Sequence, residues 1–510
     1  MSRNISIFVL SNINVLNPLA MRKDTTIISE LQEFFLQNDS YKAINRISDV
    51  LSSLRLRESQ IGISKASNCK LSVLQVFQLL ILFPFFGVKD AFHYNASALG
   101  KFFNCQKDMF YSFMKNDVID WRKLLYIVSL QLIDRIIVRG DSKKSKFPVC
   151  LVADDTDLVK TGRRIELIGK IYSHVLHIQR LGFKGLFLMR TDGKTQTMLD
   201  FSLHGEEGKN PERPQGMSKK ELDARYTVER DKNSHGAKRV AEHSMDKQTK
   251  LREMIVLAIK KDIRFDYLLV DSWFTCTDLV RFVKGRHIKC HFLGMIKMGN
   301  TKYTSKKYGE LTAKGCIDKL QRIKKGIRYS RALNCWYGEM EVELGGMSVK
   351  LFFCRRGKHG NWNGLLTTNT DLDFFEAYRI YSMRWAIEVA FNEMKGLLRL
   401  GKCESRNFTE QIASISLVVI QYNILGLVKR FNSYETIGGL FAEITSGTAE
   451  LSVVERLWAL ILEVVTEIAA AISADYVELM EAAINGNSHL RRLFMHEYST
   501  MKLEICTSES

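Results

Sequence analysis

Two short apolar runs, each followed directly by an aspartate, constrain the fold of this chain more than any other feature. Residues 147–153 form the first run, which leads into Asp154, and residues 265–270 form the second, which leads into Asp271. Short runs rich in valine and leucine are typical of buried strands. We therefore predict an α/β fold in which each of two buried strands presents an aspartate at its carboxyl end.

More strands are predicted directly after the first run. Residues 182–190 and 197–203 have strand-like composition, and Asp192-Gly193 between them is a turn signal. Because the connections are short, we expect the first three strands to form an antiparallel meander.

A β-rich insertion is predicted at residues 297–370. Within it, residues 340–344 and 347–353 alternate between apolar and polar side chains, which is the period of a strand. Gly345-Gly346 lies between them and is typical of a tight hairpin turn. The insertion is expected between the last strand of the α/β region and the helix described next.

Residues 381–395 have the pattern of an amphipathic helix. Apolar side chains recur at helical spacing at Ile380, Met383, Ile387 and Phe391. A second stripe on the same helix is made of polar side chains, which are Tyr381, Arg384, Glu388 and Lys395. Upstream, Asp373 and Glu376 have the spacing of a capping box, which predicts where the helix begins.

The polar stripe offers the groups that phosphodiester chemistry requires. The carboxylate of Glu388 can hold a divalent metal ion, and the cations Arg384 and Lys395 can bind phosphates. A solvated helix face stabilised by an Arg384–Glu388 ion pair is the competing interpretation. An aspartate at a strand end is likewise often a turn former or a helix N-cap, which is the competing interpretation of Asp271.

The charge of the chain favours a polyanionic partner. Lysine and arginine number 74 against 56 acidic residues, which gives a net charge of +18 and an isoelectric point near 9.3. Nucleic acid and an anionic membrane surface are the two candidates, and charge that only keeps the protein soluble is the alternative. The most apolar stretch, residues 71–88, is interrupted by Gln75, Gln78 and Pro84, so we expect a buried helix there and no membrane partner.

The ten cysteines contain no C-x-x-C pair. This spacing argues against a zinc ribbon and against a disulfide framework, and it fits a reducing cytosol.

Residues 205–252 are dense in lysine and arginine, including Lys238 and Arg239. We predict a long polar loop that runs into a basic helix. Positive charge of this density suits contact with a DNA backbone, and a solvated flexible loop is the alternative.

The two ends of the chain are predicted to be helical. Residues 1–140 contain segments with helical apolar spacing, at residues 31–36, 44–54, 71–83 and 121–138. This N-terminal domain could bind the ends of a DNA element or serve as a structural layer, and the sequence does not decide between the two. Residues 431–510 are predicted to form a further helical region, with residues 451–472 strongly apolar.

Three motifs of the chain resemble those of one enzyme family. The polar stripe has the form Y-x2-R-x3-E-x6-K, which resembles the signature of DDE transposases of bacterial insertion sequences of the type named after insertion sequence four. Asp154, Thr156 and Leu158 are similar to the first motif of that family, and Asp271-Ser-Trp-Phe274 to the second. The resemblance covers residues 145–430. It implies a ribonuclease-H-like mixed sheet flanked by helices, with the β-rich insertion in its usual place.

The resemblance also implies an activity. A transposase of this type catalyses metal-dependent DNA cleavage and strand transfer, which is cut-and-paste transposition. Asp154, Asp271 and Glu388 would hold two Mg²⁺ or Mn²⁺ ions. The residues that would position DNA phosphates are Tyr381, Arg384 and Lys395. Such enzymes act as homodimers on terminal inverted repeats and target DNA, here in the nucleoid of a bacterial cytoplasm.

Some alternatives stay open at this stage. Asp155 is a second candidate for the first metal ligand, because adjacent residues of a strand point to opposite faces; the spacing to Thr156 and Leu158 favours Asp154. Trp336 and Trp362 in the insertion are candidates for stacking on a flipped base, and core packing is the ordinary role of each. A hydrolysis-only nuclease and a non-catalytic DNA-binding protein derived from a transposase are the competing functions.

Overall fold

The structure is a computed structural model of the 510-residue chain. It describes residues 50, 54–65, 70–86, 88–96, 105–139, 147–173, 176–285, 288–357, 359–431 and 437. The chain divides into two compact units. The first unit comprises Met1–Arg55, Lys65–Phe110 and Gly439–Ser510, and the second comprises Leu56–Ser64 and Tyr111–Gly438.

The described part of the first unit is helical. Helix α5 (Val73–Leu82) begins at Ser72, whose side chain accepts a hydrogen bond from the N–H of Gln75 in a capping box. It is followed by the 3₁₀ turns η2 (Phe83–Phe86) and η3 (Tyr94–Ala96). The ring of Tyr94 lies 5.5 Å from that of Phe83 and 4.6 Å from that of Phe110, so an aromatic cluster forms the core there. The helix predicted at residues 71–83 is confirmed.

Some predicted regions lie outside the described residues. These are the helices at 31–36 and 451–472, most of the helix at 44–54, and most of the C-terminal region at 431–510. The predicted domain boundary at residue 140 differs from the division of the structure. Helix α8 (Trp121–Arg139), which we assigned to the N-terminal domain, belongs to the second unit, because it packs against α16 (Phe408–Phe431) and strand β4.

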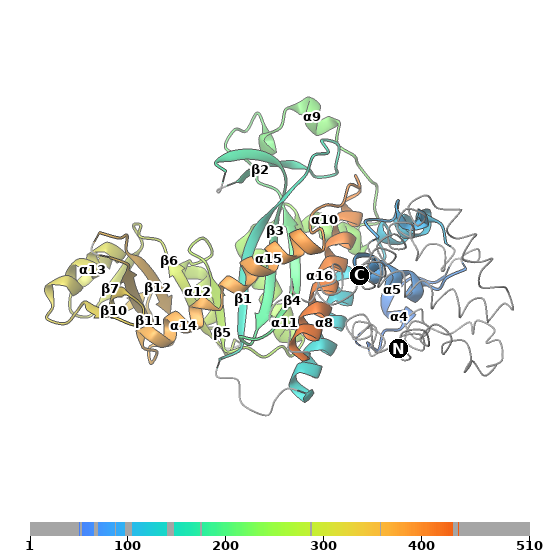
Figure 1. Cartoon of the computed structure of the whole chain (residues 1–510). Helices are drawn as coiled ribbons and strands as arrows, with labels where there is room; N and C mark the ends of the chain where they lie inside the picture. The colour runs from blue at the N-terminus through green and yellow to red at the C-terminus, as the bar shows by residue number, and fades with distance from the viewer. Residues whose placement is uncertain are drawn as a thin grey trace, which may run out of the picture. The chain divides into compact units, whose positions relative to one another are not determined.

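The second unit is built on a sheet of twelve strands (Figure 1). The strand order is β2-β3-β1-β5-β6-β12-β11-β10-β7-β8, with β4 paired to β3 and β9 paired to β10. The strands are β1 (Cys150–Val159), β2 (Gly169–Ser173), β3 (Ile178–Thr191), β4 (Gln196–His204), β5 (Tyr267–Val270), β6 (His291–Ile296), β7 (Lys302–Ser305), β8 (Gly309–Thr312), β9 (Arg328–Ser330), β10 (Cys335–Leu344), β11 (Met347–Arg355) and β12 (Asn363–Thr367).

The predicted meander is confirmed and contains one strand more than expected. β3 pairs antiparallel with both β1 and β4. The turn between β3 and β4 forms because Asp192 Oδ1 accepts N–H hydrogen bonds from Lys194 and Thr195, while Gly193 takes a φ of 82°. β2 was not predicted; it pairs antiparallel with the first residues of β3.

The centre of the sheet is parallel. β1 pairs with β5, and β5 with β6, in parallel registers. Helix α12 (Thr277–Val283) connects β5 to β6. This arrangement places the carboxyl ends of β5 and of the parallel part of β1 at one edge, where ligands of α/β sheets usually bind.

The β-rich insertion is continuous with the central sheet. β12 pairs antiparallel with β6 over residues 364–367, so the strands β7–β12 extend the sheet instead of forming a separate body. Helix α13 (Ala313–Arg322) packs on this part. The predicted β10–β11 hairpin is confirmed: Gly345 and Gly346 have φ values of 55° and 79°, as a tight turn of the mirror-image type requires.

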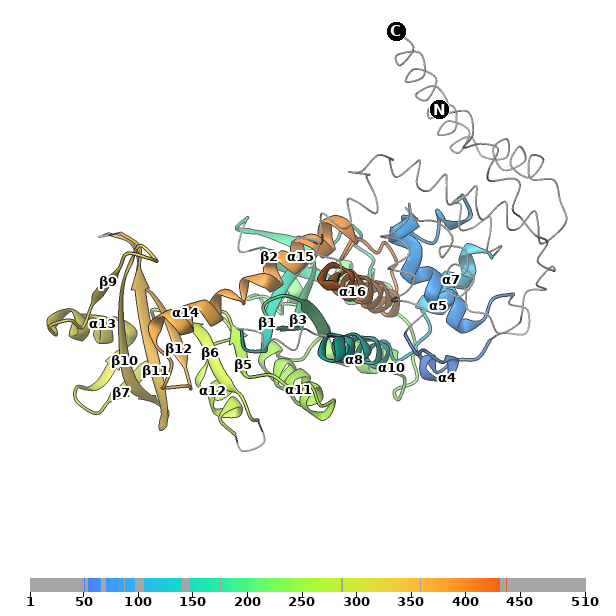
Figure 2. The same cartoon turned by 60° about the horizontal axis from the view of Figure 1, so that its bottom comes forward.

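Helices cover the two faces of the central strands. Helix α15 (Trp385–Leu397) lies on one side of β1 and α11 (Lys247–Lys260) on the other (Figure 2). Residues of β1 alternate accordingly: Leu151 and Ala153 join the apolar cluster that contains Ile255 of α11. On the α15 side, the ring of Phe187 in β3 packs 5.2 Å from that of Phe391.

Helix α16 is the one helix among the described residues that is long and apolar enough to cross a membrane. In the most apolar 18-residue window of this helix, 94% of the residues are buried inside the structure, so the helix serves as a core element of the second unit.

The segment at residues 205–252 is not the long polar loop that we predicted. It contains the helices α9 (Lys219–Asp223) and α10 (His235–Glu242) and the start of α11. Several of its cations are neutralised inside the protein by acidic residues. Arg230 binds both oxygens of Glu166, with Nη2 at 2.7 Å from Oε2. Because that partner lies 64 residues away, composition alone suggested a solvated segment.

Candidate active site

The parallel register of β1 and β5 brings two predicted ligands together. Ala153 pairs with Val270, so the next residues, Asp154 and Asp271, lie beside each other. β1 does not end at Asp154 as predicted but continues to Val159, paired with β3 alone. Asp154 therefore lies within a strand, at the point where its parallel neighbour ends.

Asp271 is also a turn former. Its Oδ1 accepts hydrogen bonds from the N–H groups of Trp273 at 2.9 Å and Phe274 at 3.1 Å. The two interpretations of this residue are thus compatible, because one carboxylate oxygen holds the turn and the other has no protein hydrogen bond in the described part of the chain.

The predicted helix at residues 381–395 consists of two helices that meet at the stripe. α14 (Phe374–Ser382) begins at Asp373, whose side chain accepts from the N–H of Glu376, and α15 begins after Arg384. Met383 and Arg384 keep helical backbone angles and close i→i+3 hydrogen bonds. The polar stripe therefore continues through the junction, which is tighter than an α-helix.

Arg384 joins two of the three predicted carboxylates. Its Nη1 donates to Asp154 Oδ2 at 2.9 Å and its Nη2 donates to Glu388 Oε1 at 2.6 Å. The Arg384 side chain is 13% exposed, and its Nε has no hydrogen-bond partner among the described residues. One guanidinium thus pairs with two carboxylates, which come from β1 and α15.

Tyr381 and Lys395 complete the stripe on either side. The hydroxyl of Tyr381 donates to the backbone oxygen of Val270 at 3.3 Å, and burial raises the pKa of Tyr381 to about 12. Lys395 Nζ donates to Thr156 Oγ1 at 2.6 Å, and burial lowers the pKa of Lys395. Both residues therefore face β1 and β5, as a site at these strands requires.

The negative charge of Asp154 is only partly neutralised by nearby cations. Burial and the neighbouring Asp271 raise the pKa of Asp154 to about 7, against the opposing effect of Arg384. A second cation near Asp154 and Asp271 would relieve this cost. Perturbed carboxylates of this kind mark functional sites, although structural ion pairs produce them too.

The donor set fits a hard divalent cation in part. Asp154 and Asp271 supply oxygen ligands, which Mg²⁺ prefers. Among the described residues, no three His, Cys, Asp or Glu side chains lie close enough to hold one ion. Glu388 is turned toward Arg384, so it would have to exchange that hydrogen bond for a metal ligand.

Asp155, the alternative to Asp154, faces the opposite side of β1. Its carboxylate forms an ion pair with Lys247, the first residue of α11. The Lys247 ammonium also lies 4.0 Å from the centre of the Trp273 ring. The structure therefore brings Asp154, and not Asp155, to Arg384 and Glu388.

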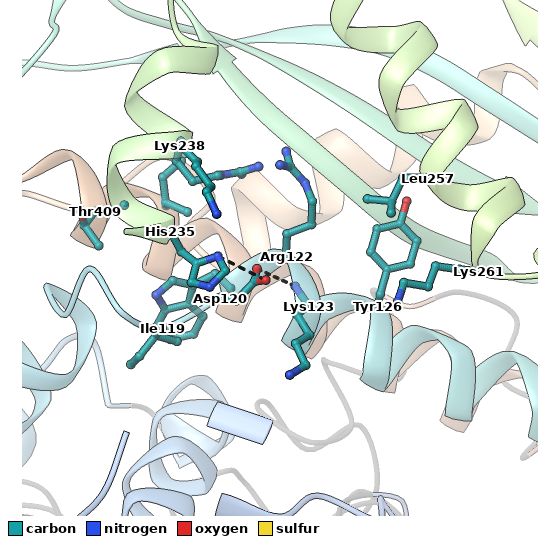
Figure 3. A pocket seen from close by; sticks show the side chains of 14 residues that line it. Ile119, Asp120, Arg122, Lys123, Tyr126, His235, Lys238, Leu257, Lys261 and Thr409 are labelled. Atoms are coloured by element: carbon teal, nitrogen blue, oxygen red, sulfur yellow. Dashed lines mark hydrogen bonds and ion pairs between the residues drawn. The ribbon is translucent and has the colours of Figure 1, made fainter. Parts of the chain in front are cut away.

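The two basic residues predicted to bind DNA have different surroundings. Lys238 is exposed on α10, and Figure 3 shows it with His235 and Asp120 at a cavity of about 370 Å³ between α8, α10 and α11. Arg239 is only 7% exposed. Its Nη1 donates to Glu242 at 3.1 Å, its guanidinium lies 4.5 Å from the Phe201 ring, and burial lowers its pKa to about 10. Arg239 is thus part of the protein interior and not of a surface.

The tryptophans of the insertion lie away from the carboxylates in the strand order. Trp336 on β10 is half-buried, and its ring lies 5.1 Å from that of Tyr329. Trp362 is also half-buried, and its ring lies 4.8 Å from the Arg355 guanidinium. Strand β10 is separated from β5 by β6, β12 and β11. Both residues have packing partners, as core tryptophans do.

Two residues at the site were not singled out from the sequence. Trp273 is 42% exposed directly beside Asp271, and Lys247 holds its ring. The sequence signal that could have identified Trp273 is its position two residues after a strand-end aspartate. Its exposure, however, depends on tertiary packing that sequence spacing does not report.

Comparison with known proteins links part of the chain to transposases. Residues 231–424 match the family model described as the transposase DDE domain, a range that contains Asp271 and the polar stripe but not Asp154. A solved structure described as a piggyBac transposase synaptic complex with hairpin DNA is 11% identical, with a TM-score of 0.40, and covers 84% of this chain and 82% of that chain. At that score the likeness bears neither on fold nor on function. No curated protein matches the sequence.

Over residues 231–424 the chain is thus similar to transposase DDE domains. This similarity supports the interpretation of the protein as a DDE transposase. DDE transposases are a kind of polynucleotidyl transferase or nuclease.

Proposed function

We propose that this protein is a transposase of the insertion-sequence-four type that cleaves DNA and transfers the cut strands in cut-and-paste transposition. The observation that carries the proposal is the bridge by which Arg384 holds Asp154 and Glu388 together beside Asp271. The similarity of residues 231–424 to transposase DDE domains supports the same class.

In this proposal Asp154, Asp271 and Glu388 would hold two Mg²⁺ or Mn²⁺ ions. When bound, such ions activate the attacking oxygen and stabilise the leaving oxygen of a phosphodiester. Glu388 would serve as a ligand by giving up its hydrogen bond to Arg384. The freed guanidinium can then grip two phosphate oxygens, for which its planar fork of donors is suited.

The remaining members of the stripe position the substrate. The Lys395 ammonium, held by Thr156 at 2.6 Å, can neutralise a phosphate beside the scissile bond. Tyr381 orients the strand end through the backbone oxygen of Val270, directly before Asp271. The partner is DNA carrying terminal inverted repeats, bound by a homodimer in the cytoplasm, and the net charge of +18 favours that partner.

The test is cleavage of a labelled duplex that carries the ends of the DNA element encoding this chain, with Mg²⁺ or Mn²⁺. Glu388→Gln keeps the size of the side chain and removes its charge, so we expect it to abolish cleavage while DNA binding persists. Glu376→Gln is the matched control, because Glu376 lies exposed in the first turn of α14. Equal cleavage by wild type and Glu388→Gln would refute the site.

The competing functions predict other products. Nicking without joined products would identify a nuclease that only hydrolyses DNA. Binding without cleavage by the wild type would identify a DNA-binding protein derived from a transposase. In that second case the Arg384 bridge would be a permanent structural ion pair, which buried geometry of this kind also supports.

A further inference from the structure

Arg239 has a buried guanidinium of which one edge lacks a hydrogen-bond acceptor. Its Nη1 donates to Glu242 at 3.1 Å, and its Cζ lies 4.5 Å from the centre of the Phe201 ring. In the described part of the chain, neither its Nε nor its Nη2 donates to any acceptor. The residue is only 7% exposed, and buried donors of a cation without an acceptor are costly. This edge of Arg239 therefore calls for an acceptor from outside the chain.

Arg239 lines the cavity of about 370 Å³ between α8, α10 and α11 (Figure 3). Its volume lies within the range of small-ligand sites. Helix α11 covers the face of the sheet opposite α15 (Figure 2). None of the three candidate carboxylates, Asp154, Asp271 and Glu388, lines the cavity. The cavity is therefore a place separate from the candidate active site.

Cations predominate among the described residues that line the cavity. They are Arg122, Lys123, Lys238, Arg239 and Lys261. Asp120 is the one acidic residue in this described lining, and its Oδ2 already lies 3.3 Å from His235 Nδ1. Arg122 is neutralised by Asp200 and Glu242. The three lysines form no ion pair with any described acidic side chain, so the cavity has an excess of positive charge.

The shape and charge of these donors define the ligand. The Nε–Nη2 edge of Arg239 offers two parallel donors, which match two oxygens of a phosphate or a carboxylate. A phosphate monoester carries a charge near −2 at neutral pH, so it neutralises the lysines better than a carboxylate does. The apolar side chains of Leu257 and Ile412, which also line the cavity, can contact the organic part of such a ligand.

We propose that the cavity between α8, α10 and α11 binds a phosphate monoester. Two phosphate oxygens accept hydrogen bonds from Arg239, and the ammonium groups of Lys123 and Lys261 balance the remaining charge. A free nucleotide and the phosphorylated end of a DNA strand present the same group. Because the three cations come from α8, α10 and the end of α11, the ligand ties these helices together. The site does not depend on the proposed function, since it shares no residue with the carboxylates.

The experiment measures binding of deoxyadenosine monophosphate to the full-length protein by calorimetry. EDTA is present, so that no metal ion brings the nucleotide to the carboxylates. Deoxyadenosine, which lacks the phosphate, should not bind. The double variant with Lys123→Gln and Lys261→Gln should weaken nucleotide binding at least about tenfold. Arg239→Lys keeps the charge but loses the two-donor edge, so it should weaken binding by a similar factor.

Matched controls are available on the same chain. Lys260 is exposed on α11, directly before Lys261, and does not line the cavity. Lys260→Gln should therefore leave the affinity unchanged, as should Glu388→Gln at the carboxylates. Melting curves separate loss of binding from loss of folding. If Arg239→Lys does not fold, the double lysine variant decides, because Lys123 and Lys261 are exposed.

A duplex with and without terminal phosphates distinguishes the two sources of the ligand. Binding of the nucleotide that depends on Lys123 and Lys261, with no preference between the duplexes, identifies a free nucleotide. A preference for the phosphorylated duplex that the double variant loses identifies a strand end. If neither the nucleotide nor the terminal phosphate binds more tightly to wild type than to the double variant, the inference is wrong. DNA cleavage by such a protein would leave the proposed function intact, and nucleotide binding without cleavage would leave this site intact.

Discussion

Arg384 donates a hydrogen bond of 2.9 Å to Asp154, a residue 230 positions earlier in the chain. The bond joins the start of α15 to the middle of β1, and the same guanidinium reaches Glu388 one turn further along α15. Since two carboxylates share one cation, neither is fully compensated. The site is therefore arranged to accept further positive charge.

We expect Arg384→Lys to reduce cleavage strongly. A lysine keeps the charge but cannot bridge two carboxylates or grip two phosphate oxygens, so single-turnover cleavage should fall about 100-fold. Binding to the same duplex should change much less. Arg379→Lys serves as the control, because Arg379 is exposed on α14 and its ion pair with Glu376 spans 3.8 Å. Similar losses in both variants would show that position 384 has no special role.

Neighbouring cations on α10 should give opposite results. Lys238 is exposed, so Lys238→Ala should weaken DNA binding and reduce the slope of its logarithmic salt dependence by about one, with no change in melting temperature. Arg239 is buried against Glu242 and Phe201, so Arg239→Ala should lower the free energy of unfolding by about 1–3 kcal/mol. Filter binding at several salt concentrations and thermal melting distinguish the two. A purely electrostatic effect of Arg239→Ala would contradict its burial.

Glu242 is expected to be a major contributor to stability. Its carboxylate accepts hydrogen bonds from Arg122, Arg239 and Lys250, and against the opposing effect of burial these cations hold its pKa well below the usual value. Glu242→Gln leaves buried cations unpaired, so the free energy of unfolding should fall by about 3–5 kcal/mol. Urea denaturation measures it. Glu253→Gln is the control, because Glu253 is half-exposed and contacts only the outer end of the network at Lys250.

The elements that sequence spacing predicts best are those with local causes. The β10–β11 hairpin follows from Gly345-Gly346, and the start of α14 follows from the cap at Asp373. The pairing of Asp154 with Asp271 also follows in outline, because both stand where apolar runs end. Their contact, however, depends on the register of β1 against β5, which is a tertiary property.

The features that escaped prediction depend on distant partners. β1 runs on through Asp155 and Asp157 because β3 pairs with it, although these residues are poor strand formers. The insertion joins the central sheet because β12 pairs with β6, and no local sequence pattern predicts this pairing. Arg239 was predicted to bind DNA because its ion pair with Glu242 forms only in the folded chain. The neighbouring ion pair of Arg122 with Asp200 likewise joins residues that are far apart in the sequence.

A pair of buried histidines makes stability depend on pH. Burial lowers the pKa of His204 and of His243 to about 4 each, and for His243 the nearby His204 and Arg225 add to the effect. The ring of His243 lies 5.9 Å from that of Phe183 and 6.0 Å from that of Phe408, and its Nε2 has no hydrogen-bond partner among the described residues. Both rings are therefore neutral in the folded protein at neutral pH.

The direction of the pH effect follows from these values. In the unfolded chain a histidine has a pKa near 6.5, so between pH 6.5 and 4 the unfolded state binds protons that the folded state does not. Stability is therefore complete above pH 6.5 and falls as the pH is lowered toward 4. For one histidine the loss by pH 5 should be about 1–2 kcal/mol.

We expect His243→Gln to flatten this dependence. The amide does not titrate, so the difference in unfolding free energy between pH 7 and pH 5 should be about 1–2 kcal/mol smaller than in the wild type. Urea unfolding at both pH values measures it, and comparing the two proteins cancels Glu410, whose pKa burial raises to about 7 and whose effect has the opposite sign. An unchanged pH dependence would mean that water reaches His243 and that its ring is charged in the folded protein.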